Sequence, residues 1–224
     1  MTTDSPTPTI ATETAALAQG ISSRLPAEVL ATFAAEQSAL DQAGVPGGVV
    51  TAGTKLPDGE LLDAHGSATS LAAVRDGRPA VIAFYRGAWC PYCNIALRVY
   101  QSSLVGELTR RGAVLIAISP QAPDGSLSMR EKNDLTFPVL SDPGNAIAAR
   151  LGILTAPTDA VRAAQARLGV DVAAGNADGT ATLPMPTLLV VDADGTIQWI
   201  DVTPDYTART EAGDVLAAFT RTIG

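Results

Sequence analysis

The sequence has little of several residue types on which common kinds of functional site depend. Its 224 residues include two cysteines, one histidine and 4% aromatic residues. A zinc site would have only three soft ligands, Cys90, Cys93 and His65, and nothing in the sequence brings His65 toward the cysteines. We therefore expect no metal and no cofactor, and we expect His65 to lie in a surface turn with Gly66.

Positive charge and long apolar runs are also scarce. The chain has 15 Lys and Arg against 23 Asp and Glu, a net charge of −8, so nucleic acid and anionic membranes would repel it. No apolar run approaches the ~20 residues that cross a bilayer. No Lys or Arg precedes Arg24, so we expect neither a secretory signal nor a transit peptide. These absences predict a cytoplasmic protein, in which a C-x-x-C pair stays reduced between turnovers.

The chemistry that is present gathers in Trp89-Cys90-Pro91-Tyr92-Cys93, which holds both cysteines and follows the apolar run Ala80–Tyr85. A C-x-x-C can close a small disulfide, and a helix that begins at the first cysteine aims unpaired backbone N–H groups at its sulfur. Both effects favour a thiolate, so the motif predicts a redox site at a strand-to-helix junction. Asn94 and Arg98, one turn apart on that helix, are expected only to face solvent.

Apolar periodicity predicts strands that alternate with helices. Strands are expected over 80–85 and 113–119, with an extended piece at 137–140 and a hairpin of 187–191 and 196–202 around the turn 192–195. Helices are expected over 93–110, 126–133, 146–151 and 211–223. The fold class is therefore α/β, with a mixed central sheet flanked by helices.

The length and the 46% hydrophobic content suit one core with appendages. Residues 1–9 are predicted to be a disordered leader, and residues 10–51 a helical extension and linker whose two helices are separated near Leu25-Pro26. The main domain is expected over 52–224. Within it, an insertion at about 155–180 contains a predicted helix over Asp159–Leu168, which would form a lid or an oligomer contact. The sequence therefore leaves open whether the protein forms a homodimer.

Three segments, in order along the chain, resemble the alkyl hydroperoxide reductase/thiol-specific antioxidant family. They are residues 84–93, residues 131–142 and residues 183–187, and the C-P-x-C form is similar to that of the peroxiredoxin-like branch. The resemblance covers roughly Ala52 to the C-terminus and leaves the N-terminal helices outside. It implies a thioredoxin-like fold.

The resemblance also implies roles for the two cysteines. Cys90 takes the place of the peroxidatic cysteine, whose thiolate attacks the distal oxygen of hydrogen peroxide or an alkyl hydroperoxide and becomes a sulfenic acid. Cys93 would resolve it as a disulfide, which thioredoxin or a similar dithiol would reduce. Arg86, the nearest cation in sequence, either stabilises the thiolate or forms a structural ion pair.

Residues around the pair are assigned by the same resemblance. Met185-Pro186-Thr187 resembles the cis-proline loop that faces the C-x-x-C, although a trans proline that starts a strand is the alternative. Trp89 is expected to form a wall of the site. Tyr85 and Gly87 are candidates for substrate binding together with Met185 and Thr187, while Tyr85 also fits a plain core position.

The sequence departs from the family pattern at positions that activate peroxide. Where peroxiredoxins have a proline and a Thr or Ser before the peroxidatic cysteine, this chain has Ala83 and Gly87, and it has no arginine around residues 183–187. These departures favour an alternative, a glutaredoxin/thioredoxin-like thiol-disulfide oxidoreductase. A redox sensor whose N-terminal helices bind a partner is a third hypothesis.

Overall fold

The computed structural model describes residues 9–224. The leader predicted over residues 1–9 lies outside the described residues except for Thr9. The Thr9 hydroxyl accepts a hydrogen bond from the backbone N–H of Thr12 and so caps the first helix.

A seven-stranded mixed sheet forms the centre of the described chain. Its order is β2-β1-β5-β4-β3-β8-β9. The strands are β1 (Leu61–Leu62), β2 (Ala68–Thr69), β3 (Ala80–Phe84), β4 (Val114–Ser119), β5 (Val139–Ser141), β8 (Thr187–Val191) and β9 (Ile197–Val202). β3, β4 and β5 are parallel, whereas β8 pairs antiparallel with β3 and β9. The predicted strands, hairpin and mixed sheet are confirmed.

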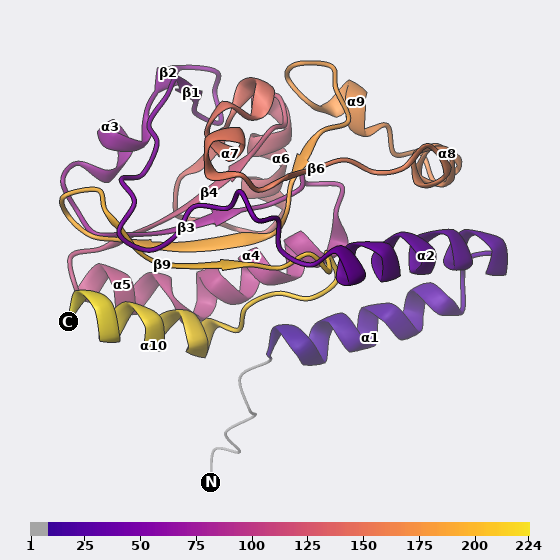
Figure 1. Cartoon of the computed structure of the whole chain (residues 1–224), viewed down its shortest axis with the longest axis horizontal. Helices are drawn as coiled ribbons and strands as arrows, with labels where there is room; N and C mark the ends of the chain where they lie inside the picture. The colour runs from indigo at the N-terminus through magenta and orange to yellow at the C-terminus, as the bar shows by residue number, and fades with distance from the viewer. Residues whose placement is uncertain (1–8) are drawn as a thin grey trace, which may run out of the picture.

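Helices cover both faces of this sheet (Figure 1). They are α3 (Leu71–Arg75), α4 (Pro91–Ser103), α5 (Val105–Arg110), α6 (Pro123–Lys132), α7 (Ala146–Leu151) and α10 (Ala212–Ile223), with a 3-10 turn at Pro143–Asn145. The helix predicted over 93–110 is in fact two, α4 and α5, which meet at Leu104. Hydrogen bonding continues through the junction, because Leu104 donates to Tyr100 and accepts from Leu108.

Residues of β3 face two cores in alternation. Val81 and Ala83 belong to the core beneath α4 and α10, while Ala80, Ile82 and Phe84 belong to the core beneath α3 and α7. Side chains of successive strand residues point to opposite faces, and a central strand with parallel and antiparallel neighbours is buried on both. The all-apolar run therefore places the end of β3, and the cysteine motif after it, deep in the molecule.

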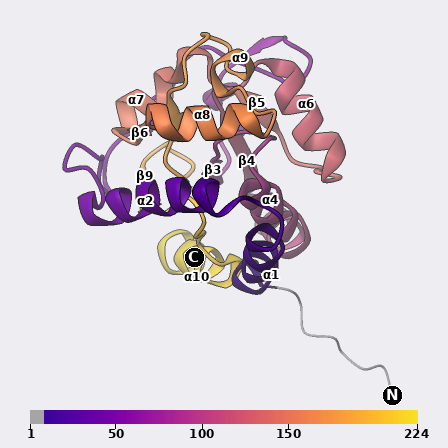
Figure 2. The ribbon, with the colours of Figure 1, turned by 90° about the vertical axis from the view of Figure 1, so that its right-hand side faces the viewer.

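Two helices precede the sheet, as predicted: α1 (Ile10–Ser22) and α2 (Ala27–Ala43). Figure 2 shows α1 alongside α4, and α2 alongside α8 (Asp159–Arg167). The Glu211 carboxylate accepts hydrogen bonds from the backbone N–H groups of Ile10 (3.1 Å) and Ala11 (2.7 Å). Because helix N-termini favour negative charge, this contact fixes the start of α1 beside α10.

The predicted insertion contains α8, α9 (Val172–Gly175) and a two-stranded ladder of β6 (Leu154–Thr155) with β7 (Leu183–Pro184). The predicted helix over 159–168 is confirmed as α8. Glu36 of α2 accepts a hydrogen bond from the Thr158 N–H at 2.8 Å, so the insertion and the N-terminal helices are joined. The division into an extension and a main domain stays a prediction.

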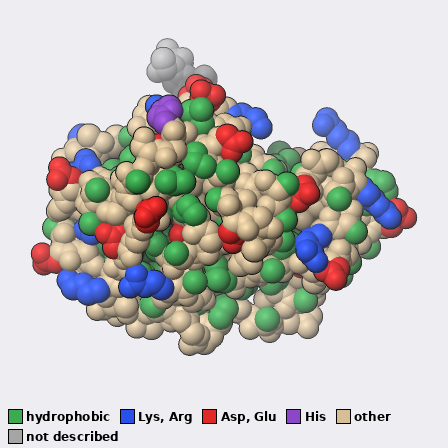
Figure 3. All heavy atoms as spheres, turned by 90° about the horizontal axis from the view of Figure 1, so that it is seen from above, with side chains coloured by type: hydrophobic (Ala, Val, Ile, Leu, Met, Phe, Trp, Pro, Cys, Tyr) green, Lys and Arg blue, Asp and Glu red, His purple; other side chains and the backbone are tan. Residues whose placement is uncertain are grey.

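Charged side chains of both signs are interspersed on the face shown in Figure 3, with hydrophobic side chains scattered between them. His65 is exposed in its turn, as expected. Among the described residues, no helix is both long enough and apolar enough to cross a membrane.

Candidate active site

The two cysteines lie at the N-terminus of α4. Cys90 is the N-cap residue, Pro91 is the first residue of the helix, and the Cys93 N–H donates to the Cys90 carbonyl at 3.1 Å. Proline suits this position because the first N–H groups of a helix have no partner within the helix. Both cysteines are reduced and buried, with exposed fractions of 1% and 0%. The predicted strand-to-helix junction is confirmed.

Gly87 shapes the loop before the pair. Its φ is 152°, and a Cβ there would lie 2.8 Å from Trp89 Cδ1 and 2.9 Å from Gln121 Cδ. Gln121, two residues after the end of β4, in turn accepts a hydrogen bond from the Ala88 N–H. The loop therefore has no room for the Thr or Ser of the family pattern, and the hydrogen bond from the Ala88 N–H to Gln121 holds the loop in place.

Asn94 braces the same loop from α4. Its amide Nδ2 donates to the carbonyls of Ala88 (2.9 Å) and Cys90 (2.8 Å), and its Oδ1 accepts from Asn133. The expectation that Asn94 only faces solvent is therefore wrong. A buried carbonyl at a helix start needs a donor, and the Asn94 amide reaches back one turn to supply it. Arg98 is exposed, as expected.

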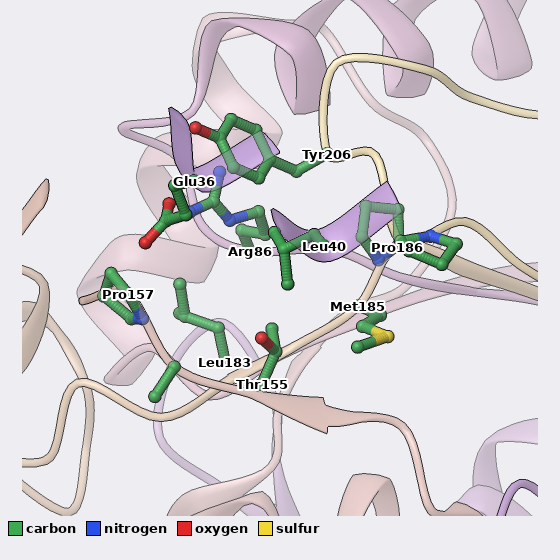
Figure 4. Close-up of a pocket in the computed structure, with 11 residues that line it drawn as sticks. Glu36, Leu40, Arg86, Thr155, Pro157, Leu183, Met185, Pro186 and Tyr206 are labelled. Atoms are coloured by element: carbon green, nitrogen blue, oxygen red, sulfur yellow. The ribbon is translucent and has the colours of Figure 1, made fainter. Parts of the chain in front are cut away.

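Arg86 is buried among aromatic rings. Its guanidinium lies 4.0 Å from the centre of the Tyr206 ring (Figure 4) and 5.1 Å from the centre of the Trp89 ring. Arg86 is 5% exposed. Within residues 9–224 it forms no ion pair. Of the two roles predicted for Arg86, the structural ion pair is therefore wrong, and the cation–π contacts fix its position instead.

Arg209 is a site residue that the sequence analysis missed. It lies in the loop between β9 and α10, and its Nη2 donates to Cys93 Sγ at 3.1 Å. Its Nη1 donates to the carbonyls of Tyr206 (2.6 Å) and Ala208. Arg209 is separated from Cys93 by 116 residues, and no motif surrounds it, so only the fold shows that the two meet.

The two thiols differ in acidity. Burial raises the pKa of Cys90 well above its usual value. Burial alone would also raise the pKa of Cys93, but the hydrogen bond from Cys90 and the charge of Arg209 outweigh it, so the Cys93 pKa lies well below its usual value. The direction at Cys90 is the reverse of the one that the helix start predicts. The hydrogen bond from Arg209 therefore favours a thiolate at Cys93 over one at Cys90.

The Met185-Pro186-Thr187 loop is not a cis-proline loop. No peptide bond among the described residues is cis, so the predicted cis proline is wrong and the trans alternative holds. The loop is fully hydrogen-bonded: the Met185 N–H donates to Ile153, its carbonyl accepts from the Thr187 hydroxyl, and the Pro186 carbonyl accepts from Thr203. It therefore presents no free backbone edge to a substrate strand.

The remaining predicted residues divide into a cavity lining and a core. Met185 and Pro186 line a small cavity with Arg86 and Tyr206, drawn in Figure 4, whose volume of about 10 Å³ fits about one water-sized molecule. Tyr85 and Thr187 are 2% and 0% exposed, within the core and β8. Trp89 packs partly buried against the core beside the cysteines, at the place predicted for a wall of the site.

A larger groove runs past the site. It has a volume of about 440 Å³ and lies between α1, Gln37 of α2 and the loop Thr207–Arg209, with Tyr92 in its lining. Tyr92 and Arg209 are also the residues next to the thiols, so the inner side of the groove lies against the C-x-x-C. Small side chains of α1, such as Ala15 and Ala18, form its outer wall.

The sequence model of the AhpC/TSA family matches residues 52–200, about two thirds of the chain. The chain belongs to the AhpC/TSA family. The matched stretch contains both cysteines, Arg86 and the Met185 loop, whereas α1, α2 and Arg209 lie outside it.

Individual relatives to which the chain is similar are named peroxiredoxins. It is 36% identical over 103 residues to a candidate peroxiredoxin of Mycobacterium tuberculosis, covering 46% of this chain and 64% of that protein. It is 28% identical over 153 residues to the chloroplastic peroxiredoxin Q of rice, Oryza sativa subsp. japonica, covering 68% of this chain and 59% of that protein. The chain thus spans slightly less than two thirds of the length of these curated relatives.

A solved structure is similar in fold to this chain. The crystal structure of the peroxidoxin BcpB from Mycobacterium tuberculosis superimposes with a TM-score of 0.59 at 21% identity, covering 78% of this chain and 99% of that one. At this identity the likeness concerns the fold, and the predicted thioredoxin-like fold of this AhpC/TSA protein is confirmed.

Proposed function

We propose that this protein is a thiol-dependent peroxidase that reduces hydrogen peroxide or alkyl hydroperoxides through Cys90 and Cys93. The observation that carries the proposal is a reduced C-x-x-C pair at a helix start, next to two guanidinium groups, in a chain of the AhpC/TSA family. Cations beside a buried thiol pair favour the thiolate, which is the nucleophile in peroxide reduction.

Cys90 is the sulfur that attacks the distal peroxide oxygen, as the family pattern implies, and Cys93 is the resolving thiol. The attack breaks the O–O bond, converts Cys90 to a sulfenic acid and releases an alcohol or water. Cys93, one helical turn away, then attacks the Cys90 sulfur and displaces its oxygen as hydroxide. The disulfide that results is returned to the dithiol by thioredoxin or a similar reductant in a reducing, cytoplasmic compartment.

The substrate reaches the pair only when the closed site opens. Both sulfurs are covered, and the cavity beside Arg86 accommodates about one water-sized molecule. Movement of Tyr92 or of the loop that carries Arg209 would join the thiols to the groove along α1. A homodimer built on α8 and its insertion remains compatible with this route, because the groove lies on α1.

A thiol-disulfide oxidoreductase is the second candidate, and Gly87 is the observation that favours it. The tight contacts of Gly87 with Trp89 and Gln121 leave no place for the hydroxyl that orients peroxide in the family pattern. A pair without this group would still exchange with disulfides.

Single-cysteine variants distinguish the two candidates. Cys93→Ser is treated with one equivalent of hydrogen peroxide in the presence of a sulfenic acid trap, and Cys90→Ser serves as the matched control. We expect the trap to label Cys93→Ser at Cys90 and to leave Cys90→Ser unlabelled. Equal labelling of the two variants, with normal exchange against a disulfide substrate, would replace the peroxidase with the oxidoreductase.

A further inference from the structure

Two arginines next to the thiols, the buried Arg86 and the half-buried Arg209, lack an acidic partner. The ion pairs within residues 9–224 involve Arg98, Arg110, Arg111, Arg162 and Arg167, and neither Arg86 nor Arg209 is among them. A cation withdrawn from water is costly unless a negative charge compensates it. Glu36 lines the small cavity with Arg86 and accepts a hydrogen bond from the Thr158 N–H, whereas the negative group in contact with Arg209 is the cysteine pair.

The nearest carboxylates are already engaged. Glu211, two residues after Arg209, accepts from the backbone of α1 through both of its oxygens. Asp205 accepts from the backbone N–H and the hydroxyl of Thr207, and Asp201 accepts from the Thr210 hydroxyl. None of these three carboxylates lies within ion-pair distance of Arg209.

The geometry of Arg209 selects one of the two sulfurs. Nη1 is held by the carbonyls of Tyr206 and Ala208, and the planar guanidinium then points Nη2 at Cys93 Sγ, 3.1 Å away. Rotation of the guanidinium toward Cys90 would break its hydrogen bonds with the carbonyls of Tyr206 and Ala208. The charge of Arg209 is therefore assigned to Cys93 by the backbone around it.

The other titratable groups that face the pair are neutral or positive. Burial raises the pKa of Tyr85, at the end of β3, and of Tyr100, on α4, so both phenols keep their protons at neutral pH. Burial likewise raises the pKa of Tyr92, beside Cys90 on α4. Arg86 is the one further cation. No negative group among the residues described competes with Cys93 for Arg209.

We propose that Arg209 holds Cys93 as the thiolate of the resting pair, and that this thiolate accepts the proton of Cys90 before it resolves the Cys90 sulfenic acid. The inference deepens the proposed peroxidase function and rests on it for the catalytic steps. The contact between Arg209 and Cys93 in the reduced protein stands independently of them.

The steps balance. The Cys90 thiol transfers its proton to the Cys93 thiolate, and the Cys90 thiolate attacks the hydroperoxide, which gives a sulfenic acid and an alkoxide. The Cys93 thiol protonates the alkoxide and is again a thiolate beside Arg209. It then attacks the Cys90 sulfur and releases hydroxide. The sum converts one thiol, one thiolate and one hydroperoxide into a disulfide, an alcohol and hydroxide.

This arrangement depends on parts of the chain outside the stretch that the family model matches. Arg209 lies beyond residue 200, and the loop that carries it is braced by Glu211 against the start of α1. The N-terminal helix therefore has a structural task at the redox site. It holds the loop in the position from which Arg209 reaches Cys93.

The first test needs no peroxide. In a Cys90→Ser background, the ultraviolet absorbance of the Cys93 thiolate is titrated with pH, with Arg209 intact and with Arg209→Gln; Arg98→Gln is the control, since Arg98 is exposed. We expect the thiolate to persist below the ~8.5 of free cysteine and to disappear as the pH falls through the lowered pKa. Arg209→Gln should raise the midpoint by about one pH unit or more, a tenfold change in the ionisation constant, and Arg98→Gln should not.

The second test separates the two chemical steps. Reduced protein is mixed with hydrogen peroxide, and sulfenic acid formation and disulfide formation are followed as successive phases. Arg209→Gln should slow disulfide formation at neutral pH by about tenfold, in line with the lost thiolate, and raising the pH should restore it. Arg209→Lys should recover part of the lost rate of disulfide formation, because lysine keeps the positive charge but not the planar guanidinium.

The outcomes separate this inference from the proposed function. An unchanged Cys93 midpoint in Arg209→Gln would overturn the inference even if the protein is a fast peroxidase. A raised midpoint in a protein that does not react with peroxide would overturn the peroxidase and leave the contact in place. If Arg209→Gln does not fold, Arg209→Lys is titrated in its place. In the protein with Arg209 intact, a titration midpoint of Cys93 equal to that of free cysteine would refute the inference.

Discussion

Gly87 is the residue at which the chain departs most directly from the peroxiredoxin pattern, and the matched pair Gly87→Ala and Gly106→Ala tests the reason. A Cβ at Gly87 meets Trp89 and Gln121 at less than 3.0 Å, whereas one at Gly106, in α5, meets nothing within 4 Å. We expect Gly87→Ala to lower the free energy of unfolding by about 1–3 kcal/mol. Gly106→Ala should raise it by about 0.5–1 kcal/mol. Denaturant unfolding of both variants measures the difference, and equal stabilities would contradict the packing argument.

Asn94 offers a second test at the scale of one residue. Asn94→Leu removes the side-chain donor from the carbonyls of Ala88 and Cys90, and only Cys90 keeps other donors, the backbone N–H groups of residues 93 and 94. We expect a loss of about 1–3 kcal/mol in the free energy of unfolding, together with slower oxidation of the cysteines. Arg98→Gln, which breaks only an exposed ion pair on the same helix, should cost under about 1 kcal/mol. If both variants lose the same stability, Asn94 does not brace the loop.

Single residues also show where sequence reasoning succeeded and where it stopped. The cysteines could be placed because the apolar run before them and the proline between them locate a strand end and a helix start. Arg209 and Gln121 could not, since their contacts join the site to loops 116 and 33 residues away. The prediction for Asn94 was wrong because a residue at a helix start can equally face solvent. Only the structure shows that its side chain reaches the carbonyls of Ala88 and Cys90.

At the scale of elements, α1 is predicted to control access to the thiols. Ile10 is 1% exposed and belongs to the same core as Cys93, whereas Ala16 on the same helix is exposed. We expect Ile10→Ser to loosen the start of α1, because burial of an isoleucine contributes about 1.5–3 kcal/mol. Ala16→Ser should leave α1 in place. Alkylation of the reduced cysteines under native conditions should become at least about tenfold faster in the first variant only, as 1.4 kcal/mol is a factor of ten.

Equal labelling rates for Ile10→Ser, Ala16→Ser and the parent protein would mean that the thiols open by another movement. The loop Thr207–Arg209 would then be the element to examine, because it forms the opposite wall of the groove.

The elements themselves could be predicted to different extents. The strands of the sheet and the hairpin were predictable because buried strands have a continuous or alternating apolar pattern that ends at turn residues. The proline loop at residues 185–187 was not, because the isomer of a proline bond depends on which partners its neighbours find. Here the backbone of the trans loop forms hydrogen bonds with Ile153, Thr187 and Thr203.

At the scale of the whole molecule, the charge of the redox pair links oxidation to stability. Oxidation removes the thiolate and leaves Arg209 without its counter-charge, while a disulfide that closes so short a loop constrains the unfolded chain little. We expect the reduced protein to be more stable than the disulfide form. A difference of 1 kcal/mol would appear as a shift of about 2–4 °C in Tm for a chain of this size.

Thermal unfolding of both redox forms measures this shift, and Arg209→Gln is the control. The gap between the two forms should shrink in the variant, since neither form then contains the uncompensated guanidinium. A disulfide form more stable than the reduced form in the parent protein would contradict the proposed charge balance.

The most direct test of the proposed function is the rate at which the fully reduced protein is oxidised by hydrogen peroxide. Stopped-flow fluorescence of Trp89 in a Trp199→Phe background follows the reaction, and intact mass checks for the loss of two hydrogens. We expect a second-order rate orders of magnitude above that of a free thiolate and a Cys90–Cys93 disulfide as the product. A rate no higher than that of a free thiolate would contradict it and make the protein a thiol-disulfide oxidoreductase.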